Sequence, residues 1–513
     1  MKKHILLFSM IAALVLSGCQ NNASGGDENN SGDEGQTSAD ASGQPASSLW
    51  VDSYVPPEPQ TITGDNFTIN IPADLSSMSA NSKKYVDDMR AQQRRLIAEK
   101  GADADYYLND LYGESGVDLT KGVAPCTGDS GTDGGYRDGK TPNDYLDNVA
   151  AEWEKGEKSD ENKGVTITFT PSDALKNKGY TITYGKKADL SDGVSFVTTQ
   201  TSFNLKNLLV NQKYYFKIAS DGQESSVASF TTGDYPRWID ARPMFNVRDM
   251  GGYKVKGGKR IKQGLVYRGG EITPESWNSG QSYTGDTGGR YTNKSTGKMQ
   301  DGHIATQTDD SKKIFRDQDI VSGNTVKKPM NMVNGVEIDL RSNTERAPSG
   351  KSYTSCGFAN KKSDGTTNDI DYKLISISSY DNGMKNNTSN IKQVFDLFAK
   401  ADTNPVYFHC YGGADRTGVT GFLLGAMLGM SYTDLVIDFE LTSFSSNPSR
   451  NYRSHLRNGP YNYWPRMLGY LRDTLHWDNS ITIQDGAKAY LKEKCKVTDA
   501  TIQKIESIML ENA

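Results

Sequence analysis

Hydrophobic and polar residues alternate between Val165 and Thr232 in short runs, and residues typical of turns separate these runs. Alternation with a period of two puts every second side chain on the same face of a sheet, so each run predicts a half-buried strand. We therefore expect a small all-β sandwich domain over residues 164–233. The runs are VTITF, YTITYG, VSFVTT, KYYFKIA and SSVASFTT.

Within this stretch, Leu209-Val-Asn-Gln-Lys-Tyr-Tyr215 resembles a signature of fibronectin type III domains, in which a leucine precedes a corner tyrosine by six positions. The resemblance implies that Tyr215 is the corner tyrosine. Domains of this family mostly space or bind, so we assign no chemistry to this one.

After Asp234, apolar runs of strand length alternate with helical periodicity. The run 405–409 predicts a buried strand, a helix with one apolar face precedes it, and the apolar run 418–430 behind it predicts a buried helix. This alternation predicts an α/β domain over residues 234–513, with a central sheet flanked by helices. The apolar face consists of Ile391, Val394, Phe395 and Phe398, and glycines for close helix packing recur at Gly421, Gly425 and Gly429.

Residues 49–163 form an N-terminal extension of mixed character to which the sequence assigns no function. Ser82 is a candidate N-cap for a helix that carries Val86 and Met89 and ends at Gly101. Such an extension packs on its neighbours or spaces them. Between 274 and 335, a polar and glycine-rich interval predicts an inserted loop.

The first 19 residues contain Lys2, Lys3 and an apolar run that is too short to span a bilayer, which is typical of a secretory signal peptide. Residues 20–48 have almost no large apolar side chains and predict a flexible linker. Leu-Ser-Gly-Cys19 between them resembles the bacterial lipoprotein signal. The resemblance implies lipidation of Cys19 and an extracytoplasmic protein anchored to the bacterial cell membrane, and an ordinary signal peptide with a chance cysteine is the alternative.

Composition argues against a nucleic-acid partner, a metal site and a disulfide framework. The 513 residues carry 58 basic and 63 acidic side chains, a balance that predicts no nucleic-acid partner. The five histidines are too dispersed for a metal site, and we expect neither metal nor cofactor. The oligomeric state does not follow from the sequence. Besides Cys19 there are too few cysteines for a disulfide framework, namely Cys126, Cys356, Cys410 and Cys495.

The predicted strand and buried helix are joined by His409-Cys-Tyr-Gly-Gly-Ala-Asp-Arg-Thr-Gly418. A tight loop with two glycines at a helix N-terminus turns backbone N–H groups towards a tetrahedral phosphate dianion. The same field stabilises a thiolate, which makes Cys410 a candidate nucleophile. Arg416, six residues on, can hold two phosphate oxygens with its planar guanidinium.

These residues resemble the protein tyrosine phosphatase superfamily, whose signature is His-Cys, five residues, Arg, then Ser or Thr. The resemblance implies that Cys410 attacks phosphorus and that Thr417 helps the thiolate leave, while His409 orients the loop. Phosphate would be bound by Tyr411, Gly412, Gly413, Ala414, Asp415 and Arg416.

Further blocks resemble the bacterial branch of that family, whose loop reads His-Cys-x-x-Gly-Lys-Asp-Arg-Thr-Gly, over about residues 238–511. They are 246–253, 264–271, 338–345 and a C-terminal segment in which Thr498 is a natural N-cap. We expect five charged residues of these blocks to support the loop rather than take part in the chemistry: Arg248, Asp249, Asp339, Arg341 and Glu345.

The leaving oxygen requires a proton, for which the sequence offers two carboxylic acids. Asp415 lies in the loop and resembles the family's proposed general acid. Asp381 stands 29 residues before Cys410, about where larger eukaryotic-type phosphatases place an acid on a mobile loop. We favour Asp415 and keep Asp381 as the alternative.

We expect hydrolysis of phosphomonoesters, with phosphotyrosine or dual-specificity protein substrates favoured. Ala414 replaces the family's usual lysine and weakens the case for phosphoinositide or inositol phosphate substrates, which remain the alternative within the enzyme class. A non-catalytic surface binding protein with a phosphatase fold is the alternative outside it. A basic and aromatic stretch lies where relatives carry a helical lid. It is either a surface that faces acidic substrates or a solvated helix face. Its residues are Arg450, Tyr452, Arg453, His455, Arg457, Tyr461, Tyr463, Trp464 and Arg466.

Overall fold

The computed structural model describes residues 58–107, 162–242, 244–271, 319–342, 370–445 and 481–513, with short pieces within 282–301, 314–317 and 467–471. In these parts of the chain, no helix combines the length and apolar character that crossing a membrane requires. The expected signal peptide, linker and lipidated Cys19 lie outside the described residues.

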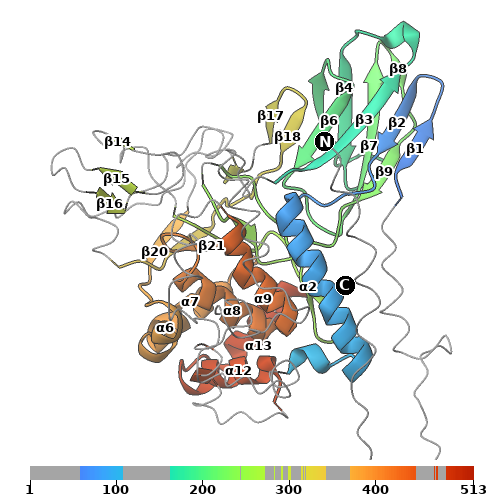
Figure 1. Ribbon diagram of the computed structural model, residues 1–513. Helices are drawn as coiled ribbons and strands as arrows, with labels where there is room; N and C mark the ends of the chain where they lie inside the picture. The colour runs from blue at the N-terminus through green and yellow to red at the C-terminus, as the bar shows by residue number, and fades with distance from the viewer. Residues whose placement is uncertain are drawn as a thin grey trace, which may run out of the picture. The chain divides into compact units, whose positions relative to one another are not determined.

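Two sheets share one apolar core in the sheet-rich part of the chain (Figure 1). Each of the five predicted runs contains a strand, and side chains alternate between core and solvent along it. Phe203 and Phe216, from opposite sheets, pack edge to face with ring centroids 5.4 Å apart. One sheet runs β1 (Gln60–Thr63), β2 (Phe67–Ile71), β3 (Val165–Pro171), β6 (Ser202–Lys206), β18 (Thr325–Lys327) and β17 (Ile320–Ser322). The other contains β5 (Val194–Thr198), β4 (Tyr180–Gly185), β7 (Lys213–Ser220), β8 (Gln223–Glu224) and, paired with β7, β9 (Ala228–Thr231).

The corner contact of this region is made by Tyr214 and not, as expected, by Tyr215. The backbone N–H of Leu209 donates to the Tyr214 hydroxyl over 3.0 Å, and the Tyr214 ring is buried. Tyr215 is only partly buried, and Lys213 lies 5.2 Å from its ring centroid. Adjacent residues of a strand face opposite sides, so a one-residue error in spacing exchanges the inner for the outer tyrosine.

The first sheet is assembled from three separate segments of the chain. Strands β1 and β2 come from the N-terminal extension, and β18 pairs in parallel with β6 from within the interval that the sequence predicts as an inserted loop. The expectation of a loop at 274–335 is therefore wrong in part, because backbone pairing is not visible in polar composition. Short strands β14 (Ser282–Tyr283), β15 (Arg290–Thr292) and β16 (Met299–Asp301) also lie there.

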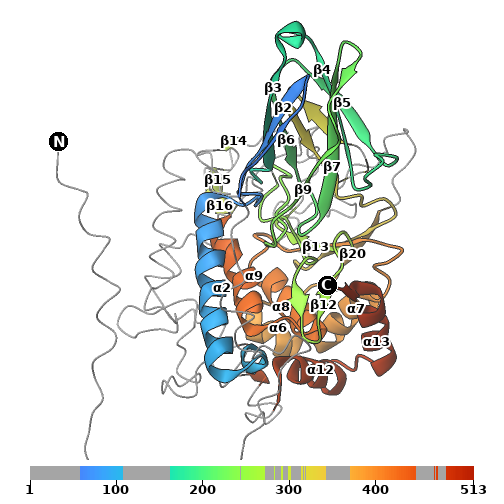
Figure 2. The same ribbon diagram turned by 90° about the vertical axis from the view of Figure 1, so that its right-hand side faces the viewer.

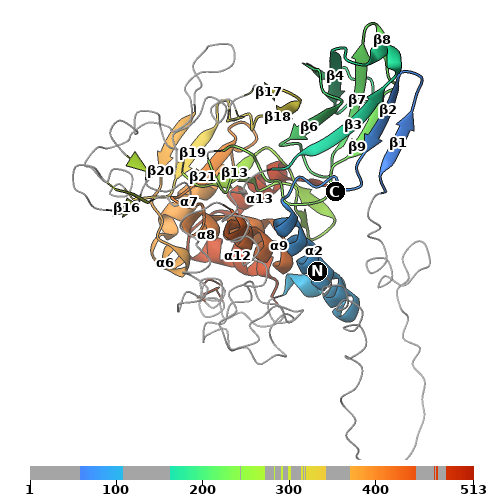
Figure 3. The ribbon, with the colours of Figure 1, turned by 45° about the horizontal axis from the view of Figure 1, so that its top comes forward.

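The α/β part is built around a five-stranded sheet, along which Figure 3 shows β20, β19, β21 and β13 side by side. All neighbours in it are parallel except the pair β10 and β13. In sheet order the strands are β10 (Arg248–Asp249), β13 (Val266–Gly269), β21 (Val406–His409), β19 (Val336–Asp339) and β20 (Asp371–Leu374). The helices are α6 (Tyr380–Asn386), α7 (Thr388–Phe398), α8 (Arg416–Leu428), α9 (Tyr432–Leu441), α12 (Ile483–Glu493) and α13 (Asp499–Met509).

Each face of this sheet has its own apolar core. On β21, Val406 and Phe408 belong to the core shared with the helices, whereas Tyr407 belongs to a second core with Phe315 and Met332. The strand is therefore covered on both sides, as expected for parallel strands without polar alternation.

The helices around the predicted strand form where the sequence indicates. The four apolar residues predicted for the helix before it are the buried residues of α7. Helix α8 is buried from Thr417 onwards, and a Cβ at Gly421 would lie 2.7 Å from Arg268, so the glycine admits that side chain. Thr498 caps α13 by accepting the Thr501 N–H over 3.1 Å, which confirms that prediction. The last strand, β22 (Leu510–Asn512), pairs with β12 (Lys259–Ile261), which also pairs with β11 (Lys254–Val255).

Helix α2 (Ala80–Lys100) of the N-terminal extension packs beside α9 (Figure 2). Its N-cap residue is Ser79 rather than the expected Ser82, whose hydroxyl lies 2.8 Å from that of Ser79 one turn earlier. The extension is thus part of the same apolar core as the α/β sheet, to which it contributes Tyr85, Val86 and Met89.

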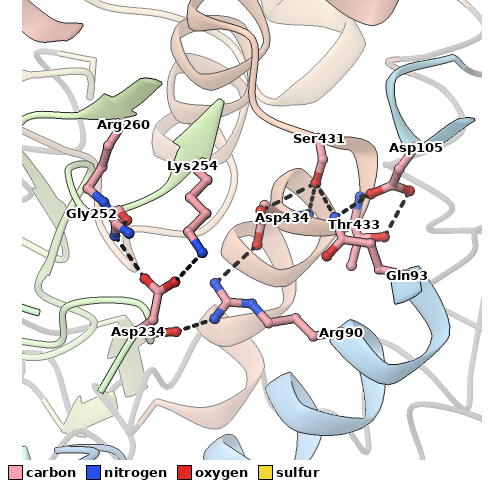
Figure 4. Close-up of polar contacts among 10 residues, drawn as sticks. All are labelled: Arg90, Gln93, Asp105, Asp234, Gly252, Lys254, Arg260, Ser431, Thr433 and Asp434. Carbon is pink, nitrogen blue, oxygen red and sulfur yellow. Dashed lines mark hydrogen bonds and ion pairs between the residues drawn. The ribbon is translucent and has the colours of Figure 1, made fainter. Parts of the chain in front are cut away.

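Polar groups fix the helix in this position (Figure 4). The guanidinium of Arg90 bonds the carbonyl oxygen of Asp234 and lies 3.3 Å from the Asp434 carboxylate. Gln93 donates to Asp105 over 2.7 Å and to Ser431 over 2.9 Å, and Asp105 also accepts the backbone and hydroxyl hydrogens of Thr433. Burial works against the charge on Asp234, but Arg90, Arg260 and Lys254 outweigh it and lower its pKa to about 2.

Replacing Arg90 by methionine is expected to lower the free energy of unfolding by about 1–3 kcal/mol, because it leaves a largely buried Asp434 carboxylate without its cation. The urea midpoint measures this. Arg94→Met, one turn on in α2, is the matched control, since Arg94 has no ion pair within the described part of the chain, and it should change stability by no more than about 0.5 kcal/mol. Equal shifts for both variants would contradict this function of Arg90.

Candidate active site

Cys410 lies at the carboxyl end of β21, inside the parallel part of the sheet, and α8 begins six residues later at Arg416. Ligands of open α/β sheets bind outside the carboxyl ends of the strands. The strand and helix predicted from the sequence therefore present the loop 410–415 at the place where such a sheet forms sites. Cys410 is buried and makes no disulfide.

Three consecutive carbonyl groups of this loop are hydrogen-bonded to residues outside it. The Tyr411 oxygen accepts the Glu271 N–H over 3.1 Å, and Asn246 donates to the Gly412 and Gly413 oxygens over 3.1 and 3.0 Å. In a trans peptide the N–H points opposite to the carbonyl. The N–H groups that follow these three carbonyls consequently point to the other side, as binding of an oxyanion requires.

Gly413 occupies a position in the loop that only glycine fits. Its φ is +67°, and a Cβ there would lie 2.4 Å from the Gly269 carbonyl oxygen. The loop therefore packs directly on the backbone at the end of β13.

His409 lies next to Cys410 in a buried polar network. Its Nε2 lies 3.0 Å from Glu337 Oε1, and its Nδ1 lies 3.1 Å from the Cys410 carbonyl oxygen. Burial disfavours the imidazolium, yet Asp339 and Glu337 outweigh burial and raise the pKa of His409. Both ring nitrogens face acceptor oxygens, so a protonated imidazole at this position can donate to both.

Arg248 and Arg268 form a buried brace beneath the loop together with Asp438 of α9. Arg268 is ion-paired with the Asp438 carboxylate and donates to the Gly413 oxygen over 3.0 Å. Arg248 lies 3.5 Å from the same carboxylate and bonds the Asn246 side chain. Burial and the neighbouring Arg268 lower the pKa of Arg248 to about 10.

The other charged residues expected to support the loop are engaged in buried ion pairs. Asp249 accepts from Arg237 over 2.6 Å and from two backbone N–H groups, while burial raises its pKa. Asp339 accepts from Arg341 over 2.8 Å, and this cation outweighs burial to lower the pKa of Asp339. Arg341 also pairs with Glu271. Glu345 lies outside the described residues.

The two candidate acids lie in different surroundings. The Asp415 carboxylate accepts a hydrogen bond from the Tyr380 hydroxyl. Asp381, next to that tyrosine, is paired with Lys385 over 2.8 Å in the first turn of α6. Thr417 is fully buried, and among the described residues its hydroxyl has no hydrogen-bond partner.

Several predicted residues lie outside the described part of the chain, namely Cys126, Cys356 and the basic and aromatic stretch 450–466. Cys495 is buried and unpaired, and burial raises the pKa of its thiol to about 11, so it is a weak nucleophile.

Sequence reasoning missed Asn246, Arg268, Glu337, Asp438 and Tyr380 as parts of the site. Asn246 and Arg268 stand in blocks that were already compared with the family, but their targets are carbonyl oxygens, which no sequence motif marks. Asp438 could have been found from the sequence. It stands inside the apolar run Leu435-Val-Ile-Asp-Phe439, and a buried acid requires a charged or hydrogen-bonding partner.

Comparison with known families agrees with this geometry. The model of a tyrosine phosphatase family matches residues 239–283 and 330–511, and the interval between the two matches lies within the expected insertion. No curated protein matches the chain. A domain of this family indicates a phosphatase. The chain is therefore similar to a tyrosine phosphatase family over these two segments.

Proposed function

We propose that the protein hydrolyses phosphomonoesters through a cysteinyl-phosphate intermediate. The observation that carries the proposal is the loop 410–415, in which outward bonds hold three consecutive carbonyls and turn the following N–H groups to the other side. A phosphate dianion bound there lies at the N-terminus of α8, whose dipole favours negative charge.

In the first step, the Cys410 thiolate attacks phosphorus and the bond from phosphorus to the leaving oxygen breaks. Asp415 gives its proton to that oxygen, and Arg416 together with the loop N–H groups stabilises the equatorial oxygens. In the second step, water attacks the phosphocysteine, its proton passes to Asp415, and the sulfur leaves as thiolate. The buried Thr417 hydroxyl, which has no other partner among the described residues, is available to donate to this thiolate.

Asp415 is the better supported acid. It belongs to the loop, whereas the Asp381 carboxylate is paired with Lys385. An acid that must change its protonation state in every turnover is served poorly by a permanent cation at 2.8 Å.

For the substrate we propose phosphotyrosine or other phosphorylated residues of proteins. Phosphoinositides and inositol phosphates are the second candidate, because Ala414 removes one positive charge but the stretch 450–466 supplies others. The membrane anchor at Cys19 and the extracytoplasmic location also remain part of the proposal. The Tyr214 contact supports a fibronectin type III-like domain over 164–233, serving as spacer or binding module.

Phosphate release by the full chain tests the function. We expect release from a phosphotyrosine peptide at a higher kcat/KM than from phosphoinositide vesicles. Faster release from the vesicles would favour the lipid substrate. Absence of release from every phosphomonoester, including a dinitrophenyl phosphate, would favour the non-catalytic alternative.

The choice of acid has its own test. Asp415→Asn is expected to lower kcat by about 10²-fold on phenyl phosphate, a typical contribution of a general acid, but little on dinitrophenyl phosphate, whose leaving group requires no proton. Asp381→Asn should show no such selectivity. The reverse pattern would assign the acid to Asp381.

A further inference from the structure

We infer that Tyr380 is a positioning residue that holds the Asp415 carboxyl group for proton transfer. The inference rests on the proposed function and assigns a further residue to its acid step. The motivating contact is the hydrogen bond from the Tyr380 hydroxyl to Asp415 Oδ1.

The Asp415 side chain does not cap its own helix. It occupies the N-cap position of α8, where an aspartate ordinarily accepts a backbone N–H of the first turn, yet its side chain makes no capping bond. Among the described residues its hydrogen-bond partner is Tyr380, which comes from a different element. The carboxylate is thus oriented by the tyrosine rather than used for the helix.

Tyr380 has a left-handed backbone conformation. Its φ is +49°, a conformation that costs energy for a bulky residue and persists only where the surroundings impose it. The ring is buried, with its centroid 6.4 Å from that of Phe439 on α9. The surrounding structure therefore holds the Tyr380 side chain in one conformation, as a positioning residue requires.

Helix α6, which begins at Tyr380, is anchored at several points. Gly383 packs so closely that a Cβ would lie 2.3 Å from the Ser378 carbonyl oxygen. Tyr490 on α12 donates to the Met384 carbonyl over 2.7 Å, and Asp381 is paired with Lys385 within the helix. The support of the Asp415 carboxyl group thus extends from the loop through α6 to α12.

The contact also determines which oxygen delivers the proton. A protonated carboxylic acid has one O–H and keeps acceptor capacity on the other oxygen. Because Oδ1 accepts from Tyr380, the proton resides on Oδ2. The tyrosine thus fixes the direction of donation as well as the side-chain rotamer.

The test is Tyr380→Phe in the full chain, which removes only the hydroxyl. We expect kcat on phenyl phosphate to fall about tenfold, the effect of one lost hydrogen bond, with KM unchanged. On dinitrophenyl phosphate kcat should stay within about twofold, since that step requires no proton. In the background of Asp415→Asn, adding Tyr380→Phe should have no further effect.

Tyr490→Phe is the matched control, because it removes another hydroxyl that anchors α6 but does not contact Asp415. It is expected to lower stability without any dependence on the leaving group. An equal loss on both substrates for Tyr380→Phe, or a further loss in the Asp415→Asn background, would overturn the inference alone. If Asp415→Asn itself showed no leaving-group dependence, the acid assignment would fail, and the inference with it.

Discussion

Replacing Cys410 by serine is expected to abolish phosphomonoester turnover, with a loss of roughly 10⁴-fold or more in kcat. An alcohol at this position ionises far less readily than a thiol, and the N-terminus of α8 cannot close that gap. Steady-state rates on dinitrophenyl phosphate measure the loss. The leaving group of this substrate requires no proton, so the rate reports on the nucleophile and not on the general acid.

The same variant tests the covalent intermediate. Wild-type protein quenched during turnover of labelled substrate should retain phosphate, and Cys410→Ser should not. The buried Cys495 is the control, because Cys495→Ser should retain both label and activity. Label that persists in the serine variant, or an undiminished rate, would show that the reaction does not pass through Cys410.

Replacing Asp438 by asparagine is expected to lower the free energy of unfolding by about 3–5 kcal/mol, because two buried guanidinium groups lose their counter-charge. Activity should fall as well. Without the carboxylate, Arg268 is no longer held in position to donate to the Gly413 carbonyl oxygen, so the loop can shift. A small displacement of catalytic groups lowers the rate by about 10²-fold. Denaturant unfolding and kcat/KM at a temperature where the variant is folded measure the two effects.

Asp434→Asn is the matched control one turn earlier on α9. Its carboxylate faces Arg90 of α2 and does not contact the brace of the loop. We expect lower stability with unchanged kcat. A loss of activity in Asp434→Asn as large as in Asp438→Asn would mean that α9 acts as a whole and not through the Arg268 contact.

The strand and the helices around Cys410 follow from the sequence because their signals are local. Cys410, Arg416 and Thr417 lie within eight consecutive residues, and the strand before them and the helices on both sides follow from apolar periodicity. The N-cap at Thr498 is equally local, since it depends on residues three positions apart.

Contacts between distant segments are not predicted in the same way. Asn246 lies 166 residues from the carbonyl group it holds, and the donor at Tyr380 lies 35 residues from Asp415. Polar side chains that bond carbonyl oxygens leave no period or motif. The same reason explains why the pairing of β18 with β6 was missed, because a parallel pair of short strands has no turn between its members.

The composite sheet has a consequence for how the protein is made. Its strands run from Gln60 to Lys327, so it cannot be completed until most of the chain has been synthesised. Helix α2 can pack in its native position only later still, because its partner α9 ends at Leu441. Native contacts over such separations slow folding. The first segments to be synthesised are thus among the last to reach their places, and during that interval their unpaired strand edges need protection from association with other chains.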